Sequence, residues 1–131
     1  MFNKTIPSET SAIAPLLQES LEYLRALKSQ GIAAHVDEFY FALSLDELLT
    51  NAVVHGNLHD PGKRIQLSIE PHGYSVEIKV TDQGNGYDPA SVPDPRKPEC
   101  VFRSWGRGIH LVKNVAKVKW NGKGNEVRVR L

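Results

Sequence analysis

The sequence has little cysteine, no long apolar run and no marked excess of charge of either sign. Its 131 residues include one cysteine, Cys100, so an internal disulfide is impossible, and no Cys/His cluster has the spacing of a zinc site. No apolar run approaches the ~20 residues that a membrane span needs. The first residues lack the apolar core of a signal peptide. These absences favour a reducing cytoplasm, away from the membrane.

The charge is nearly balanced, with 16 Lys and Arg against 15 Asp and Glu, a net charge of +1. A nucleic-acid-binding domain usually shows a strong basic excess, so we expect no direct contact with nucleic acid. A hydrophobic content of 40% is ordinary for a globular protein. The length fits one domain, which we expect to span residues 1–131.

Two common nucleotide-binding motifs are also missing. The pattern G-x-x-x-x-G-K-[ST] of the P-loop does not occur. The dinucleotide pattern G-x-G-x-x-G begins at Gly106 and Gly108, but Leu111 stands in its last place. A nucleotide site in this chain must therefore be built in another way.

The spacing of apolar residues predicts helices and strands in turn. Steps of three or four predict an amphipathic helix over about residues 14–29 and a second from Asp37, its N-cap, to about His55. Alternation predicts a hairpin over residues 65–80, and a third helix over about residues 109–115 precedes a closing hairpin of residues 118–131. Residues 2–6 fit a short edge strand, and residues 87–105, with four prolines, fit a long loop. Much of the apolar surface with which the second helix would pack is expected to come from Val36, Phe39, Leu43, Leu49, Ala52 and Val53.

These elements predict an α+β fold. Helices on one side and strands on the other give a two-layer α/β sandwich. We expect a mixed, mostly antiparallel sheet, covered on one face by about three helices.

The second predicted helix carries a polar ridge of Ser44, Glu47, Asn51 and His55, spaced by three, four and four residues. An ordinary solvated helix face would give the same pattern. The residue types favour a site, because Glu47 and Asn51 place a carboxylate and an amide oxygen side by side. Oxygen ligands suit Mg²⁺, and a carboxylate that does not bind the metal can accept a proton from an attacking hydroxyl.

Two glycine clusters accompany this ridge. Asp82 ends an apolar strand, and Gly84 and Gly86 then permit positive φ and close approach of the backbone to a flat ligand. A carboxylate there can accept hydrogen bonds from an exocyclic amine such as that of adenine. A tight turn that needs glycines is the alternative. Gly106-Arg107-Gly108 opens the third predicted helix, where free amides suit a phosphate chain.

The clusters together resemble the GHKL (Bergerat-fold) ATPases, and within them the small anti-sigma-factor serine/threonine kinases. Residues 47–57 look like the N box of that family, residues 82–88 like its G1 box, and residues 106–112 like its G2 box. Residues 123–128 are similar to its last glycine motif. Asn125 departs from the threonine that is frequent there in the wider superfamily. The resemblance covers nearly the whole chain.

The resemblance implies that ATP and Mg²⁺ are the ligands, with Asn51 on the metal and Glu47 as the general base. It implies that Asp82 contacts the adenine amino group and that Gly84, Gly86, Gly106 and Gly108 shape the pocket. Residues 87–105 would form a lid, and either Arg103 or Arg107 would contact the terminal phosphate. The implied partners are a STAS-domain anti-anti-sigma protein, which is phosphorylated, and an alternative sigma factor, which is sequestered. A homodimer is possible.

Two other functions remain as alternatives. An ATP-binding regulatory module with little or no transfer activity would keep the pocket, although the presence of both Glu47 and Asn51 favours a kinase. A histidine-kinase catalytic fragment is less favoured, because the sequence has no long helical hairpin with a phospho-accepting histidine.

Overall fold

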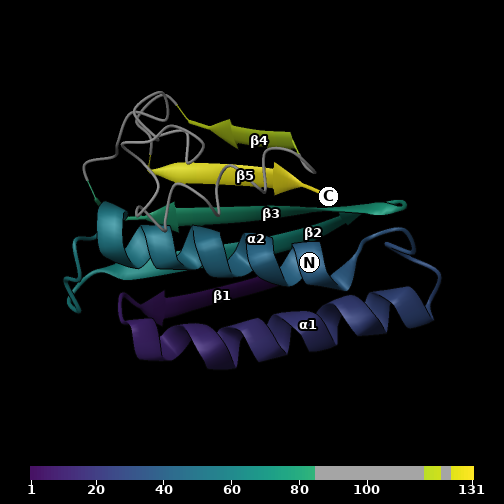
Figure 1. Cartoon of the computed structure of the whole chain (residues 1–131), viewed down its shortest axis with the longest axis horizontal. Helices are drawn as coiled ribbons and strands as arrows, with labels where there is room; N and C mark the ends of the chain where they lie inside the picture. The colour runs from purple at the N-terminus through teal and green to yellow at the C-terminus, as the bar shows by residue number, and fades with distance from the viewer. Residues whose placement is uncertain (85–116, 122–124) are drawn as a thin grey trace, which may run out of the picture.

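The computed structural model of the protein describes residues 1–84, 117–121 and 125–131. Within these residues, five strands form one sheet in the order β1-β2-β3-β5-β4. Two α-helices, α1 (Ile13–Ser29) and α2 (Glu38–Asn51), lie together on one face of this sheet (Figure 1). The predicted two-layer α+β fold is confirmed.

The strands are β1 (Phe2–Pro7), β2 (Arg64–His72), β3 (Ser75–Asp82), β4 (Lys117–Trp120) and β5 (Glu126–Arg130). All four strand pairings are antiparallel, so the described sheet is not mixed. The first predicted hairpin and the predicted edge strand at the N-terminus are present, and the two strands of the predicted closing hairpin pair as expected. The first hairpin turns at Gly73, whose φ of +62° suits a residue without a side chain.

The alternating sequence of β2 and β3 explains why only one face of the sheet is dry. Every second residue of these strands is buried beneath the helices, and the residues between them are exposed or half-buried. The buried set is Ile65, Leu67, Ile69, Val76, Ile78 and Val80, as the alternation predicts.

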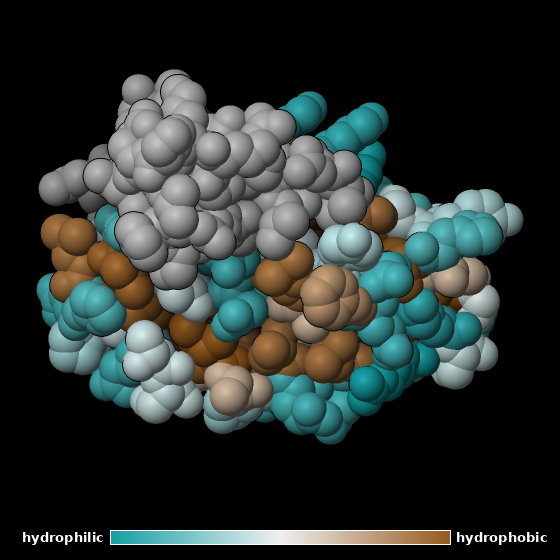
Figure 2. Space-filling view, viewed as in Figure 1, coloured by the Kyte–Doolittle hydropathy of each residue, from teal (hydrophilic) through white to brown (hydrophobic). Residues whose placement is uncertain are grey.

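Helix α1 follows a short 3₁₀ turn at Thr10–Ala12 and packs its apolar stripe on the sheet. Ile13, Leu24 and Leu27 are buried as predicted, and Leu16 is more buried than the neighbouring Leu17. On this side of the molecule, apolar residues show between polar ones over the two helices (Figure 2). None of the helices in the described part of the chain is long and apolar enough to cross a membrane.

Helix α2 begins as predicted, since the Asp37 side chain accepts a hydrogen bond from the Tyr40 amide at 3.1 Å. Its buried face was only partly predicted. Phe41, Leu45 and Leu48 are at most 1% exposed, but Phe39 is 68% exposed. The prediction failed at Phe39 because this helix is apolar on several sides, so periodicity alone does not select the face that meets the sheet.

The predicted long loop of residues 87–105 and the predicted third helix lie outside the described residues, as does Cys100. Of the three helices predicted to cover the sheet, the structure therefore tests only α1 and α2.

Candidate functional site

A small pocket, with a cavity volume of about 10 Å³, lies between the C-terminal end of α2 and the strands β3, β5 and β4. Helix α2 and the residue after it contribute Leu48, Asn51 and Ala52, and the sheet contributes apolar side chains and Asp82. Asp82 and Asn51 come from sequence segments about 30 residues apart, and the fold brings them to the same pocket. The remaining lining residues are Val80, Trp120, Asn125 and Val127.

Asn51 is the most unusual residue of the pocket. Its side chain is 3% exposed, and within the described part of the chain neither its amide nitrogen nor its carbonyl oxygen has a hydrogen-bond partner. A buried polar group without a partner costs about 1–3 kcal/mol, and native proteins contain few of them. Because the side chain lines the pocket, a polar ligand there could satisfy both atoms.

Glu47 lies one helical turn before Asn51 and is half-buried. Burial raises the pKa of the Glu47 carboxyl from 4.5 to about 7, and the neighbouring Asp46 carboxylate adds to the rise. A carboxyl with this pKa is well suited to accept a proton near neutral pH. Glu47 itself is not among the described residues that line the pocket.

The other two members of the predicted polar ridge have different surroundings. The Ser44 side chain is fully buried and its hydroxyl donates to the Tyr40 carbonyl of the same helix at 2.7 Å. His55 is half-buried, and burial, with His59 nearby, lowers the pKa of its imidazole. The ridge is thus neither a simple solvated face nor a set of four equivalent ligands.

Asp82, the last residue of β3, lines the same pocket with only 6% exposure. Its amide donates to the Asn125 carbonyl at 2.9 Å, and the Asn125 side chain donates to the Asp82 carbonyl at 3.1 Å. One carboxylate oxygen accepts from the Gly84 amide at 2.8 Å. Asn125, which sequence reasoning noted only as a departure from the family pattern, therefore fixes the backbone of Asp82.

Gly84 and Gly56 are required because the backbones of two segments meet there. A Cβ on Gly84 would lie 1.9 Å from the Gly56 carbonyl oxygen, and a Cβ on Gly56 would lie 2.2 Å from an Asp82 carboxylate oxygen. Gly84 does not have the positive φ that was expected of it. Glycine is needed at position 84 because the backbone there passes close to the backbone of Gly56. The close approach expected from the sequence was to a flat ligand instead.

The chain leaves α2 through a π-helical turn, η2 (Ala52–Gly56), and then the fully buried Asn57. The Asn57 side chain donates to the Arg64 carbonyl at 3.1 Å and accepts from the Gln83 amide at 2.8 Å. It thereby ties the end of α2 to the start of β2 and the end of β3. In the sequence, residues 56 and 57 were included only as the end of the stretch that resembles the N box. A π turn, which often marks functional sites, has no simple sequence signal.

Comparison with known proteins identifies the family of this chain. Residues 7–131 match the histidine kinase-like ATPase domain family. The chain belongs to this family. Over 74 residues it is also 27% identical to an anti-sigma F factor of Anoxybacillus flavithermus (strain DSM 21510 / WK1), a match that covers 53% of this chain and 49% of that protein. The chain thus spans about half the length of this curated relative.

Membership in an ATPase family implies ATP binding, and the residues present fit that ligand. Asn51 offers an unpaired buried amide, and Asp82 offers a buried carboxylate in the same pocket. No group of three or more His, Cys, Asp or Glu side chains that could hold a metal occurs among residues 1–84, 117–121 and 125–131. A magnesium ion carried by ATP needs no such cluster, because it is usually held by one or two side chains together with phosphates and water.

Four predicted site residues of this histidine kinase-like ATPase lie outside the described residues: Gly86, Gly106, Arg107 and Gly108. The predicted lid, with Arg103, lies there as well. The described part of the site therefore comprises the helix and the strand end, without the glycine-rich segment expected at the phosphates.

Proposed function

We propose that this histidine kinase-like ATPase is a serine/threonine protein kinase and anti-sigma factor. It binds Mg-ATP in the pocket between α2 and β3, phosphorylates a STAS-domain anti-anti-sigma protein and sequesters an alternative sigma factor. The observation that carries the proposal is the buried, unpaired Asn51 in the same pocket as the buried Asp82.

In this proposal Asp82 recognises the adenine end of the nucleotide. Its carboxylate accepts a hydrogen bond from the exocyclic amine, and two hydrogen bonds with Asn125 hold its backbone before the ligand arrives. Preorganisation of this kind lowers the entropic cost of binding. The apolar residues Val80 and Val127 line the same pocket, as a flat ring requires.

Asn51 is the residue of the described pocket that would hold the Mg²⁺ of Mg-ATP. Its amide oxygen is a hard ligand of the type that Mg²⁺ prefers. A bound Mg²⁺ supplies charge neutralisation for the phosphates. The amides of Gly106-Arg107-Gly108 and of Gly86 are proposed to complete the phosphate site.

Glu47 is the proposed general base. The hydroxyl oxygen of the partner's serine or threonine forms a bond to the γ-phosphorus while the bond from that phosphorus to the β,γ-bridging oxygen breaks. ADP leaves, and the hydroxyl proton passes to the Glu47 carboxylate. A pKa of about 7 lets a substantial fraction of Glu47 accept the proton at neutral pH and lose it again to water.

The name of the Anoxybacillus relative supports the assignment of partners, since that protein is an anti-sigma factor. We propose a cytoplasmic location because transcription factors are found there, and a homodimer as one possible form. An ATP-binding regulatory module without transfer activity is the alternative.

The test is to incubate the purified chain with labelled ATP and the STAS proteins of its own genome. We expect label on one STAS partner. Glu47→Gln should lower the transfer rate by about 10²–10⁴-fold and change the ATP dissociation constant less than about threefold, because it removes only the base. Asp82→Asn should abolish measurable ATP binding. Glu22→Gln, a change at an exposed residue of α1, should alter neither quantity.

The outcomes separate the two functions. ATP binding without transfer to any STAS protein would favour the regulatory module. Normal ATP binding by Asp82→Asn would show that the adenine pocket lies elsewhere.

A further inference from the structure

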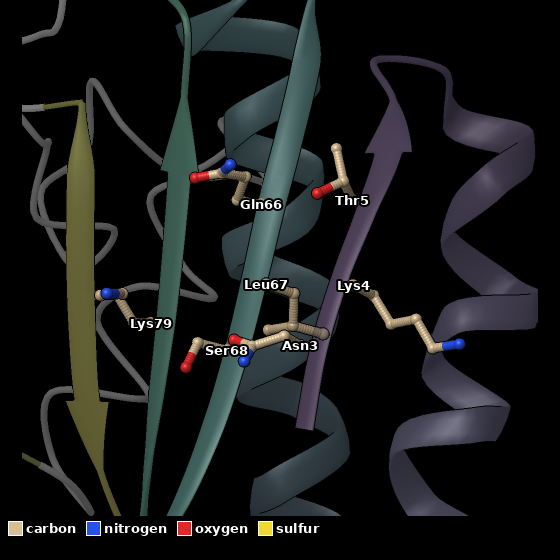
Figure 3. Close-up of a pocket in the computed structure, with 7 residues that line it drawn as sticks. All are labelled: Asn3, Lys4, Thr5, Gln66, Leu67, Ser68 and Lys79. Atoms are coloured by element: carbon tan, nitrogen blue, oxygen red, sulfur yellow. The ribbon is translucent and has the colours of Figure 1, made fainter. Parts of the chain in front are cut away.

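The face of the sheet turned away from the helices has two unlike halves. Over β1 and β2 it carries mainly uncharged side chains, such as Thr5, Gln66 and Ser68, around a hollow of about 240 Å³ that Lys79 of β3 also lines, with helix α2 behind the strands (Figure 3). Over β3, β5 and β4 it carries a set of cations that we call the basic face. Its members are Lys79, Lys117, Lys119, Arg128 and Arg130.

Strand register places these cations directly beside one another. Lys79 of β3 is opposite Arg128 of β5, which is in turn opposite Lys119 of β4. Lys117 is likewise opposite Arg130. Side chains in such positions have Cβ atoms roughly 4.5–5.5 Å apart, and like charges there destabilise a sheet. Three adjacent strands thus present a continuous row of positive charge at a cost to stability.

Carboxylates on the same face compensate only part of this charge. Glu77 lies 3.0 Å from Arg130 and 3.6 Å from Arg128, and Glu126 lies 3.8 Å from both Lys79 and Arg128. Lys117 and Lys119 make no ion pair with any described acid. Over β3, β5 and β4, two acids against five cations leave three positive charges, with one further acid, Glu70 of β2, beside Glu77. The whole chain has a net charge of only +1.

The basic face also has the shape of a docking surface. Its side chains surround a hollow of about 230 Å³, lined by Glu77 and four of the cations. Arg128 and Arg130 are about half exposed, and Lys117 and Lys119 are exposed. The α2–β3 pocket lies on the opposite face of the sheet, so an occupant here would leave the nucleotide site open.

We infer that the basic face binds a protein partner through a surface rich in Asp and Glu. Carboxylates can pair with Lys117 and Lys119 and with the second side of each guanidinium, and this would relieve the like-charge contacts. A nucleic-acid backbone fits less well, because the whole chain has a net charge of only +1 and a nucleic-acid-binding domain usually shows a strong basic excess. A membrane fits less well because the basic face carries no exposed apolar side chain to insert. This inference does not depend on the kinase activity.

The test uses an eight-residue Asp/Glu peptide as the probe, titrated into the full chain at low salt. We expect Lys119→Gln/Arg128→Gln to weaken peptide binding at least about tenfold. The matched control is Arg25→Gln/Lys28→Gln on α1, which removes the same net charge from the other side of the molecule and should weaken binding less than about twofold. Equal weakening by the two double variants would overturn the inference.

Three further measurements exclude other occupants. An eight-nucleotide single-stranded DNA and vesicles with anionic lipid should bind more weakly than the peptide; tighter binding of either would contradict a protein partner. Sedimentation equilibrium should give the same oligomeric state for the chain and for Lys119→Gln/Arg128→Gln, since loss of a dimer would assign the face to a second copy.

The single variant Lys119→Gln keeps the inference testable if the double variant folds poorly. It removes a repulsive charge without breaking an ion pair, so its melting temperature should rise by about 1–3 °C while peptide binding weakens about threefold or more. A variant that bound the peptide as well as the unchanged chain would overturn the inference.

Discussion

Two buried asparagines near the end of α2, six residues apart, are held in opposite ways. Asn57 is fully buried and uses both ends of its amide, one toward Arg64 and the other toward Gln83. Asn51 is 3% exposed and uses neither end within the described structure. The residue type, the burial and the helical neighbourhood are nearly the same, so the difference lies in what each side chain faces.

The difference separates what stabilises the fold from what serves the ligand. Asn57 faces backbone groups of β2 and β3, and its bonds join the elements that carry Asp82. Asn51 faces the pocket, where its unpaired amide lowers stability in the free protein. Sites that bind or react commonly hold such groups at a cost to stability. The contrast therefore assigns Asn57 to the scaffold and supports Asn51 as a ligand-binding residue.

The largest expected effect comes from disturbing the close contact between Gly84 and Gly56, the residue before Asn57. Gly84→Ala would place a Cβ 1.9 Å from the Gly56 carbonyl oxygen, so one backbone must move. We expect the free energy of unfolding to fall by about 2–4 kcal/mol and ATP binding to weaken more than about tenfold. Gly62→Ala is the control, because its nearest neighbour is the Asp60 side chain at 3.2 Å, which can rotate away. Equal losses for the two variants in urea unfolding would show that Gly84 has no special role.

Replacing each asparagine with leucine tests the contrast itself. Asn57→Leu should lower the free energy of unfolding by about 1–3 kcal/mol, because it leaves the Arg64 carbonyl and the Gln83 amide unpaired. Asn51→Leu should raise it by about 1 kcal/mol, because it removes a buried amide that has no partner. Urea unfolding of the ligand-free proteins measures both. Destabilisation of similar size in the two variants would remove the distinction between them.

The smallest effect concerns Glu47 and pH. Because its folded pKa, about 7, lies above the ordinary value of 4.5, the folded protein holds this proton more tightly than the unfolded chain does. The contribution to stability is therefore present at low pH and is lost as pH rises from 4.5 through about 7. Since the side chain is only half-buried, solvent screening should keep this loss below about 1 kcal/mol.

Thermal unfolding at pH 5 and pH 8 measures this dependence, and Glu47→Gln should reduce it while Glu22→Gln should not. Carbon NMR of the carboxyl groups should show one glutamate titrating near pH 7 that is absent from Glu47→Gln. If Glu47 instead titrates at its ordinary value, its local environment differs from the one described.

The parts of this molecule that follow from sequence are those set by regular periodicity and local chemistry. Alternation in residues 65–80 specified both the hairpin and its buried face, and Asp37 specified the start of α2. The buried side of α2 did not follow, because an apolar helix offers several faces and only the sheet selects Phe41 over Phe39. At the site, sequence singled out Asn51, Asp82 and Gly84. It did not predict that the side chains of Asn57 and Asn125 hold neighbouring segments in place, because their hydrogen-bond partners are backbone groups in distant segments.

ATP binding with and without Mg²⁺, measured by calorimetry on the unchanged chain and on Asn51→Leu, tests the central claim most directly. We expect Mg²⁺ to strengthen ATP binding at least about tenfold in the unchanged chain and less than about twofold in Asn51→Leu, because an oxygen ligand has been removed. An equal effect of Mg²⁺ on both proteins would contradict it.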